Sequence, residues 1–173
     1  MHTMISKDIN GNEYEVTVGD LTWRPSAYGI VIRDDKILLV RENGRFHLPG
    51  GGVNLGEDPK EAVVRELMEE SGLAVTNPKL IDSSSTFFTW ENLGQTQEFS
   101  HVHSLLLYYS CDFNDDDLLN MGETKLDEYE KLADLTAEWV GIDELDEIIV
   151  GTTVDWRPVV KRVVHAKSSG SEH

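Results

Sequence analysis

The chain has 173 residues, 39% of them hydrophobic, which suits one globular domain with a real core. Its formal net charge of −17 disfavours polymeric nucleic acid and anionic membranes as partners. The single cysteine, Cys111, excludes an intrachain disulfide, and no apolar run approaches a membrane span of roughly 20 residues, so we expect a cytoplasmic protein.

The first part of the chain predicts short strands separated by turns. Residues 1–12 are polar and are expected to be flexible or to extend a sheet edge. Residues 13–18 and 27–32 have strand composition. Residues 37–40 are apolar on both faces, which predicts a central strand.

The second part predicts a similar alternation, with an acidic insertion at residues 112–131 and a flexible tail at 168–173. We expect strands at 73–80, 82–90, 98–112 and 136–142, and helices starting at 143–148 and covering 155–166. No interior linker separates a second domain. Strands with helices at these places predict an α/β class, with a mixed β-sheet covered on both faces.

The most informative stretch begins at three consecutive glycines, residues 50–52. Glycines let the backbone turn or approach a ligand where a side chain would clash. Asp58, Pro59 and Glu61 then predict a helix start, as an N-cap acceptor, a proline at the first helical position and the partner of a capping box. Gly72 predicts the helix end.

On a helical wheel this helix has an apolar arc and, opposite to it, an acidic group beside the small Ala62. The apolar arc comprises Val63, Val64, Leu67 and Met68, and the acidic group comprises Glu66, Glu69 and Glu70. Like charges at these spacings oppose helix formation. Their clustering makes sense if a hard divalent cation neutralises them. The alternative is an ordinary solvated acidic face.

The residues of this stretch follow the pattern Gly51-x5-Glu57-x7-Arg65-Glu66-Leu67-x-Glu69-Glu70-x-Gly72-Leu73. This pattern resembles the Nudix box, the signature of the Nudix (MutT-like) hydrolase family, and weaker similarity extends over about residues 23–147. Asn54 stands where many members carry an acidic residue, a position outside the box. The resemblance implies a Nudix-type α/β/α sandwich and a site for Mg²⁺ or Mn²⁺.

The resemblance also implies roles for individual residues. The metal ligands would be Glu66, Glu69 and Glu70, with Glu57 and the Gly50 carbonyl as further ligands, and Glu69 and Glu70 would also be catalytic. Arg65 would orient the Glu69 carboxylate. Some relatives take their general base from a loop after the helix, and here Glu128 or Glu130 matches best.

The activity implied is metal-dependent cleavage, by water, of the phosphoanhydride of a nucleoside diphosphate linked to another moiety. Such a small molecule is the expected partner, with a homodimer as an open alternative. The expected substrate-binding residues are Gly50, Gly51, Gly52, Arg24 and Phe46, with Trp23, Phe88 and Trp90 as further aromatic candidates. Each aromatic alone is more often a core residue.

Two other functions stay open. A catalytically silent nucleotide sensor could share the fold, although such members usually lose box carboxylates that are present here. An isomerase of an allylic diphosphate would need a catalytic cysteine, and Cys111 has no recognisable motif around it. His101 and His103 would point the same way on a strand, and we expect a packed or surface pair in preference to a metal site.

Overall fold

The computed structural model describes residues 2–8, 10–91, 99–114, 124–126, 130–131, 134–151 and 153–169. The described strands form a six-stranded sheet of order β2-β1-β8-β9-β3-β7 and a four-stranded sheet of order β10-β5-β4, with β6 beside β5. Their bounds are β1 Thr3–Lys7, β2 Glu13–Thr17, β3 Thr22–Ile30, β4 Ile32–Arg33, β5 Lys36–Glu42, β6 Arg45–His47, β7 Gly50–Gly52, β8 Thr76–Glu91, β9 Phe99–Asp112 and β10 Thr136–Gly141. The helices are α1 Pro59–Ser71 and α3 Arg157–Ser169, and the 3₁₀ turns are η1 Val18–Asp20 and η3 Ile142–Glu144.

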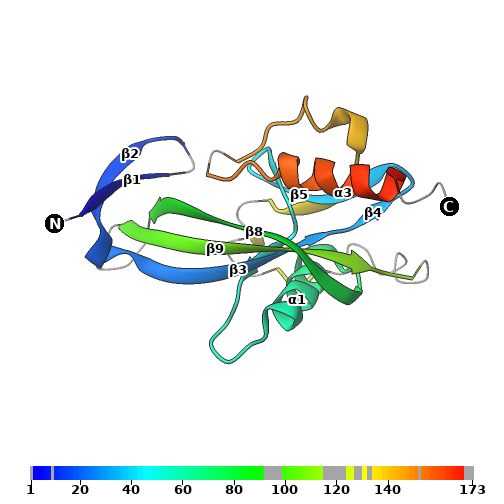
Figure 1. Ribbon diagram of the computed structural model, residues 1–173, viewed down its shortest axis with the longest axis horizontal. Helices are drawn as coiled ribbons and strands as arrows, with labels where there is room; N and C mark the ends of the chain where they lie inside the picture. Colours follow the sequence, from blue (N-terminus) through cyan, green and yellow to red (C-terminus); the bar gives the residue numbers. More distant parts are fainter. Residues whose placement is uncertain are drawn as a thin grey trace.

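Helices α1 and α3 lie on opposite sides of the long strands β3, β8 and β9, so the molecule has an α/β/α arrangement (Figure 1). The sheet is mixed, because β3 pairs with β9 and β1 with β8 in parallel, while the other pairings are antiparallel. Strand β4 follows β3 after one residue and leads the chain from the larger sheet into the smaller. The predicted fold class is therefore confirmed, with the strands divided between two sheets.

Each helix covers its own hydrophobic cluster on one side of the strands. The α3 side contains Ile37 and Leu39 of β5, and the α1 side contains Leu38 of the same strand. Successive side chains of a strand point to opposite faces, so a run that is apolar throughout must be covered on both. Strand β5 lies between β10 and β4, which confirms the central strand predicted for residues 37–40.

The contact between α1 and β3 depends on Gly29. A Cβ atom at Gly29 would lie 2.5 Å from Leu67 Cδ1 and 3.4 Å from Val63 Cγ2, and both side chains are fully buried. We expect Gly29→Ala to lower the free energy of unfolding by about 1–3 kcal/mol, because the helix and strand would have to separate. Chemical denaturation measures this change. Gly19→Ala is the control, since nothing lies within 4 Å of a Cβ atom there, and an equal loss in both variants would contradict the packing argument.

The N-terminal residues expected to be flexible or an edge addition include strand β1. It pairs along its whole length with β2, and Lys7 also pairs with Phe88 of β8. The hairpin of β1 and β2 lies at one end of the molecule, away from the C-terminus (Figure 1). The edge addition, and not a loose segment, is what the structure shows for Thr3–Lys7.

Three predicted elements differ from those observed. The two strands predicted at 73–80 and 82–90 are parts of one strand, β8. It contains β-bulges between Thr76 and Lys79 and between Leu80 and Asp82, which interrupt the alternation of its side chains without ending the strand. Residues 143–148 contain no α-helix, only the end of the η3 turn and a further turn at 145–147. Helix α3 runs to Ser169, so the predicted flexible tail begins too early.

Cys111 lies at the end of β9 and packs in the cluster on the α1 side, as expected of a small apolar group. Burial raises the pKa of its thiol to about 12. The thiolate needed for nucleophilic chemistry is therefore disfavoured. None of the helices in the described part of the chain is long and apolar enough to cross a membrane.

Candidate active site

Helix α1 is placed by the local signals that predicted it. The Asp58 carboxylate accepts a hydrogen bond from the Lys60 backbone N–H at 2.8 Å, and the Glu61 carboxylate accepts one from the Asp58 N–H at 3.3 Å. Pro59 begins the helix, and Gly72 ends it in the left-handed conformation with φ 73°. These contacts satisfy orphan backbone groups at both ends, so the start and end predicted for the helix are confirmed.

The buried face of α1 differs from the predicted apolar arc. Val64 and Met68 are only partly buried, whereas Glu66 and Glu70 are 8% and 5% exposed. The acidic side lies beneath the glycine strand β7, which the wheel could not show. The alternative of a solvated acidic face is therefore wrong for Glu66 and Glu70.

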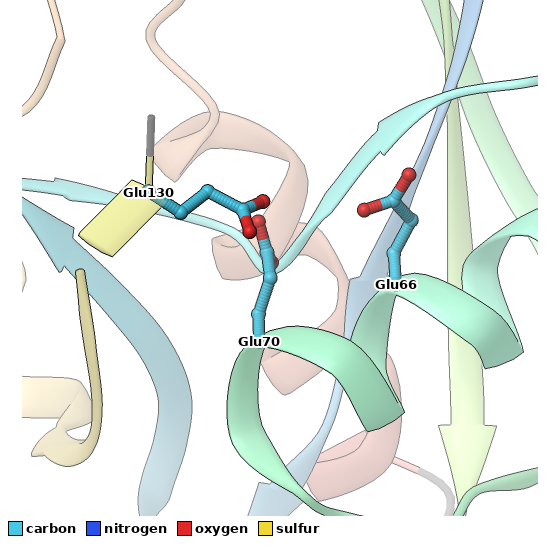
Figure 2. Close-up of side chains that lie close together, drawn as sticks. All are labelled: Glu66, Glu70 and Glu130. Carbon is cyan, nitrogen blue, oxygen red and sulfur yellow. The ribbon is translucent and has the colours of Figure 1, made fainter. Parts of the chain in front are cut away.

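Three carboxylates meet at this place. Glu66, Glu70 and Glu130 each have a carboxylate oxygen within 4.8 Å of the other two. Figure 2 shows Glu66 and Glu70 rising from successive turns of α1 and Glu130 reaching toward Glu70 from a separate segment. Glu130 is one of the two residues predicted as general base, and the other, Glu128, lies outside the described residues.

Burial and the neighbouring carboxylates disfavour the ionised forms of Glu66 and Glu70. Burial raises the pKa of Glu70 well above its ordinary value, although the Gly50 N–H donates to its Oε2 atom at 2.8 Å and opposes the shift. Burial also raises the pKa of Glu66, against the effect of Arg65. Buried carboxylates near one another are stable as anions only when a positive charge compensates them. Three carboxylate oxygen donors fit a hard divalent ion such as Mg²⁺ or Mn²⁺.

Arg65 connects the remaining acids of the box. Its Nε and Nη2 donate to the two carboxylate oxygens of Glu57 at 2.7 and 3.0 Å, and Nη1 donates to Glu66 at 2.8 Å and Glu69 at 3.0 Å. Nη2 also donates to the Gly52 carbonyl at 3.1 Å. The hydrogen bonds from Arg65 lower the pKa of Glu57. Glu57 and Glu69 thus contact Arg65 and lie outside the three-carboxylate group, so their roles as metal ligands stay predictions.

The glycines of β7 leave space that two site residues use. A Cβ atom at Gly51 would lie 2.7 Å from Glu66 Oε1, and one at Gly52 would lie 2.7 Å from Arg24 Nη2. Gly50 has φ 144°, and a Cβ atom there would lie 2.2 Å from the Ala27 carbonyl oxygen. Gly50 is therefore required by its own backbone, whereas Gly51 and Gly52 leave room for the Glu66 and Arg24 side chains, which a larger residue would displace.

A methyl group at Gly51 tests this requirement. We expect Gly51→Ala to raise the Mg²⁺ concentration needed for half-maximal thermal stabilisation about 10- to 100-fold, because the Glu66 carboxylate must move from its place. Melting curves at increasing Mg²⁺ measure the effect. Gly19→Ala serves as the control, and an unchanged Mg²⁺ requirement in Gly51→Ala would show that Glu66 is not a ligand in this position.

The predicted substrate-binding side chains occupy different surroundings. Arg24 lies against Gly52, with its guanidinium carbon 5.3 Å from the Trp90 ring centroid. Trp23 points to the opposite face of the sheet, where its ring meets His103 edge-on. Phe46 packs against the cluster on the α3 side. Of these residues, Arg24 lies nearest the glycine strand. The pairing of Arg24 with Trp90 had no signal in the sequence, because it depends on the register of distant strands.

His101 and His103 lie in aromatic and polar contacts of the sheet. The His101 Nδ1 atom is 2.8 Å from the Thr89 hydroxyl oxygen, and the His103 ring centroid is 4.2 Å from that of Phe87. Within the described chain the carboxylate cluster is the group suited to a metal ion. The interpretation of the two histidines as a packed pair is confirmed.

The α/β/α sandwich with a carboxylate cluster under a glycine strand defines a Nudix-type domain. The model of the NUDIX domain family matches residues 23–160, and the chain belongs to this family. The suspected resemblance is thereby confirmed. The match covers the glycine strand, α1 and the first turn of α3.

Individual relatives agree with this assignment. The chain is 52% identical over 50 residues to the ADP-ribose pyrophosphatase of Methanocaldococcus jannaschii, which covers 26% of this chain and 30% of that protein. It is 33% identical over 125 residues to the NAD-capped RNA hydrolase NudC of Klebsiella pneumoniae. This alignment covers 70% of this chain and 40% of that protein. The aligned part thus spans less than half the length of either relative. The solution structure of the Escherichia coli ORF135 protein superposes with a TM-score of 0.58 at 19% identity, covering 91% of this chain and all of that one, and supports the fold.

Proposed function

We propose that this protein is a Nudix pyrophosphohydrolase that uses Mg²⁺ or Mn²⁺ to cleave the phosphoanhydride of a nucleoside diphosphate linked to another moiety. The observation that carries the proposal is the group formed by the buried Glu66 and Glu70 with the half-buried Glu130. The names of the two relatives, an ADP-ribose pyrophosphatase and an NAD-capped RNA hydrolase, support the same reaction class. A bound divalent ion would supply charge neutralisation at the phosphate oxygens and a more acidic water.

The residues of the site have separate roles in this proposal. Glu66 and Glu70 hold the ion, with Glu69, Glu57 and the Gly50 carbonyl as further candidate ligands. Arg65 keeps Glu57, Glu66 and Glu69 in place through its hydrogen bonds. Glu130 accepts the proton of the attacking water, since its carboxylate reaches the same space from a separate segment.

The phosphates need a cationic contact besides the metal, because the chain has 32 acidic residues and only 15 lysines and arginines. Arg24 is the residue proposed for this contact. A Cβ atom at Gly52 would lie 2.7 Å from its Nη2 and, among the described residues, its hydrogen-bond partner is the Ser26 hydroxyl at 3.4 Å. It therefore retains donors for a phosphate oxygen. A small nucleotide derivative suits this single cation better than a polymeric backbone does.

A substrate panel tests the proposal. The protein is incubated with ADP-ribose, other nucleoside diphosphate sugars, dinucleotides and an NAD-capped RNA, each with Mg²⁺ and with EDTA. We expect release of a nucleoside monophosphate from at least one small compound, dependent on Mg²⁺. Binding without cleavage of any compound would favour the silent sensor, and cleavage of the capped RNA alone would overturn the small-molecule substrate.

The isomerase alternative is disfavoured by the position of Cys111. Its thiol packs among the apolar residues of the α1 side with a raised pKa, and it is absent from the carboxylate cluster. An assay of phosphate release with an allylic diphosphate as the substrate tests this alternative, because an isomerase would convert that compound without releasing phosphate or a monophosphate.

A further inference from the structure

We infer that Trp90 is a positioning residue: its ring holds the guanidinium of Arg24 in place, so that the remaining N–H groups of Arg24 are available to the diphosphate of the substrate. The inference rests on the proposed function and deepens it. It gives a reason for the meeting of an arginine and a tryptophan, from distant parts of the chain, beside the glycine strand.

The side chains of Arg24 and Trp90 meet across the strand β9. The guanidinium carbon of Arg24 lies over the Trp90 ring, 5.3 Å from its centroid, a distance at which the face of an indole attracts a cation. Arg24 of β3 and Trp90 of β8 lie on the same face of the sheet, on either side of Val102 of β9. Val102 between them is 1% exposed. The contact thus joins two strands that do not pair with each other.

Trp90 is held in turn by Phe88. The two rings stand two residues apart on β8 and therefore on the same face, with centroids 5.3 Å apart and planes inclined at 56°. A tilted contact of this kind stabilises an aromatic pair beyond the area that it buries. Trp90 therefore presents a fixed surface to Arg24, although 39% of Trp90 is exposed.

Two further contacts restrict the guanidinium. A Cβ atom at Gly52 would lie 2.7 Å from Arg24 Nη2 and 2.9 Å from Nε, so the backbone of β7 packs closely against the group. Arg24 Nη1 donates to the Ser26 hydroxyl at 3.4 Å, and this hydroxyl lies 3.1 Å from that of Ser104. Both serines are fully buried, which gives the arginine an anchor inside the sheet.

The restricted guanidinium lies beside the residues that hold the candidate metal ligands. Gly52 packs against Arg24, and its carbonyl oxygen accepts a hydrogen bond from Arg65 Nη2 at 3.1 Å. A guanidinium has five N–H groups, so the contact with Ser26 leaves donors for phosphate oxygens. A side chain that is already ordered loses little conformational entropy when it binds a ligand. The Trp90 ring should therefore strengthen substrate binding without a contact of its own.

Trp90→Leu removes the ring and is the first test. We expect the KM for the best substrate of the panel to rise about 3- to 30-fold, with kcat within about twofold of the parent value. Trp90→Phe keeps an aromatic face and should restore most of the parent KM. Phe87→Leu is the matched control, since Phe87 of the same strand packs on His103 on the opposite face, and its KM should equal the parent value. An unchanged KM in Trp90→Leu would overturn the inference.

A double-mutant cycle distinguishes positioning from direct contact between Trp90 and the substrate. Arg24→Ala alone should raise the KM at least as much as Trp90→Leu does. In the Arg24→Ala background, Trp90→Leu should change the KM by less than about twofold, because no guanidinium remains to be held. Independent effects of the two substitutions would mean that the ring touches the substrate itself, and would overturn the positioning role.

The Nε–H resonance of Arg24 tests the inference without turnover. The ring current of Trp90 should shift this resonance upfield in the parent and not in Trp90→Leu. Methylenediphosphonate with Mg²⁺, a probe whose P–C–P link resists hydrolysis, should shift the resonance further, and Trp90→Leu should need a several-fold higher concentration of it. A resonance that is the same in both proteins and indifferent to the probe would overturn the inference, even for a proven hydrolase. If the resonance responds as expected but no compound of the panel is cleaved, the hydrolase proposal fails and the positioning of Arg24 for a diphosphate stands.

Discussion

Glu70→Gln is expected to reduce turnover of the confirmed substrate about 1000-fold or more, and at the same time to stabilise the metal-free protein. The loss of activity follows because a metal ion contributes several kcal/mol of transition-state stabilisation, and each 1.36 kcal/mol is a factor of ten in rate. The gain in stability follows because glutamine can still accept the Gly50 N–H but carries no buried charge. Activity assays and melting curves in EDTA measure the two effects.

The stability effect has a defined pH dependence. Burial raises the pKa of Glu70 above its ordinary value of 4.5, so the folded protein disfavours the ionised carboxyl more than the unfolded chain does. The free energy of unfolding of the parent therefore decreases as the pH rises from the ordinary pKa of a glutamate through the raised pKa of Glu70. The Glu70→Gln variant lacks this decrease. At neutral pH the variant should melt about 2–4 °C higher, the shift given by ~1 kcal/mol in a chain of this size.

Glu138→Gln is the control for Glu70→Gln, because Glu138 forms an exposed ion pair with Arg41 in the other sheet. It should change neither activity nor the pH dependence of melting by a measurable amount. A Glu70→Gln variant that turned over substrate at the parent rate would contradict the metal assignment. A variant less stable than the parent in EDTA would contradict the argument from burial.

Arg65→Lys is expected to raise the Mg²⁺ concentration for half-maximal activity about 10- to 100-fold, although the positive charge is kept. Lysine cannot reproduce the guanidinium contacts to Glu57, Glu66, Glu69 and the Gly52 carbonyl at once. The carboxylates left without a donor should also lower the free energy of unfolding by about 1–3 kcal/mol. Activity at graded Mg²⁺ and chemical denaturation measure these changes.

Arg41→Lys provides the comparison for Arg65→Lys, since Arg41 donates to the one exposed carboxylate of Glu138. Its Mg²⁺ requirement should equal that of the parent. Equal Mg²⁺ requirements in Arg65→Lys and the parent would mean that the guanidinium network does not position the ligands.

The parts of the structure that could be predicted depend on neighbouring residues in the chain. The start of α1 at Asp58 and Pro59 and its end at Gly72 are local features, as is the burial of β5 on both faces. The family resemblance likewise comes from one short stretch, and it led to the correct fold class. Local physical chemistry is sufficient for the ends of α1 because their hydrogen-bond partners lie within a few residues. For β5 the apolar pattern alone indicates burial on both faces, although the covering helices are distant in the chain.

The features that escaped prediction are set by tertiary contacts. The wheel separated the acids from the apolar arc of α1, but the approach of β7 buries Glu66 and Glu70. Glu130 was named from the sequence only as one of two candidates for the general base, and its position beside Glu66 and Glu70 depends on the fold. The bulges of β8 made one continuous strand look like two.

The central claim is that Glu66 and Glu70 hold a divalent ion beside Glu130, and Mn²⁺ added to the isotopically labelled protein tests it most directly. Paramagnetic broadening should appear first, at substoichiometric Mn²⁺, at the amides of Gly50, Gly51, Glu66, Glu70 and Glu130, and excess Mg²⁺ should reverse it. The same titration of Glu70→Gln should give markedly weaker broadening there. Broadening spread evenly over the acidic surface, and equal in the parent and in Glu70→Gln, would contradict the account.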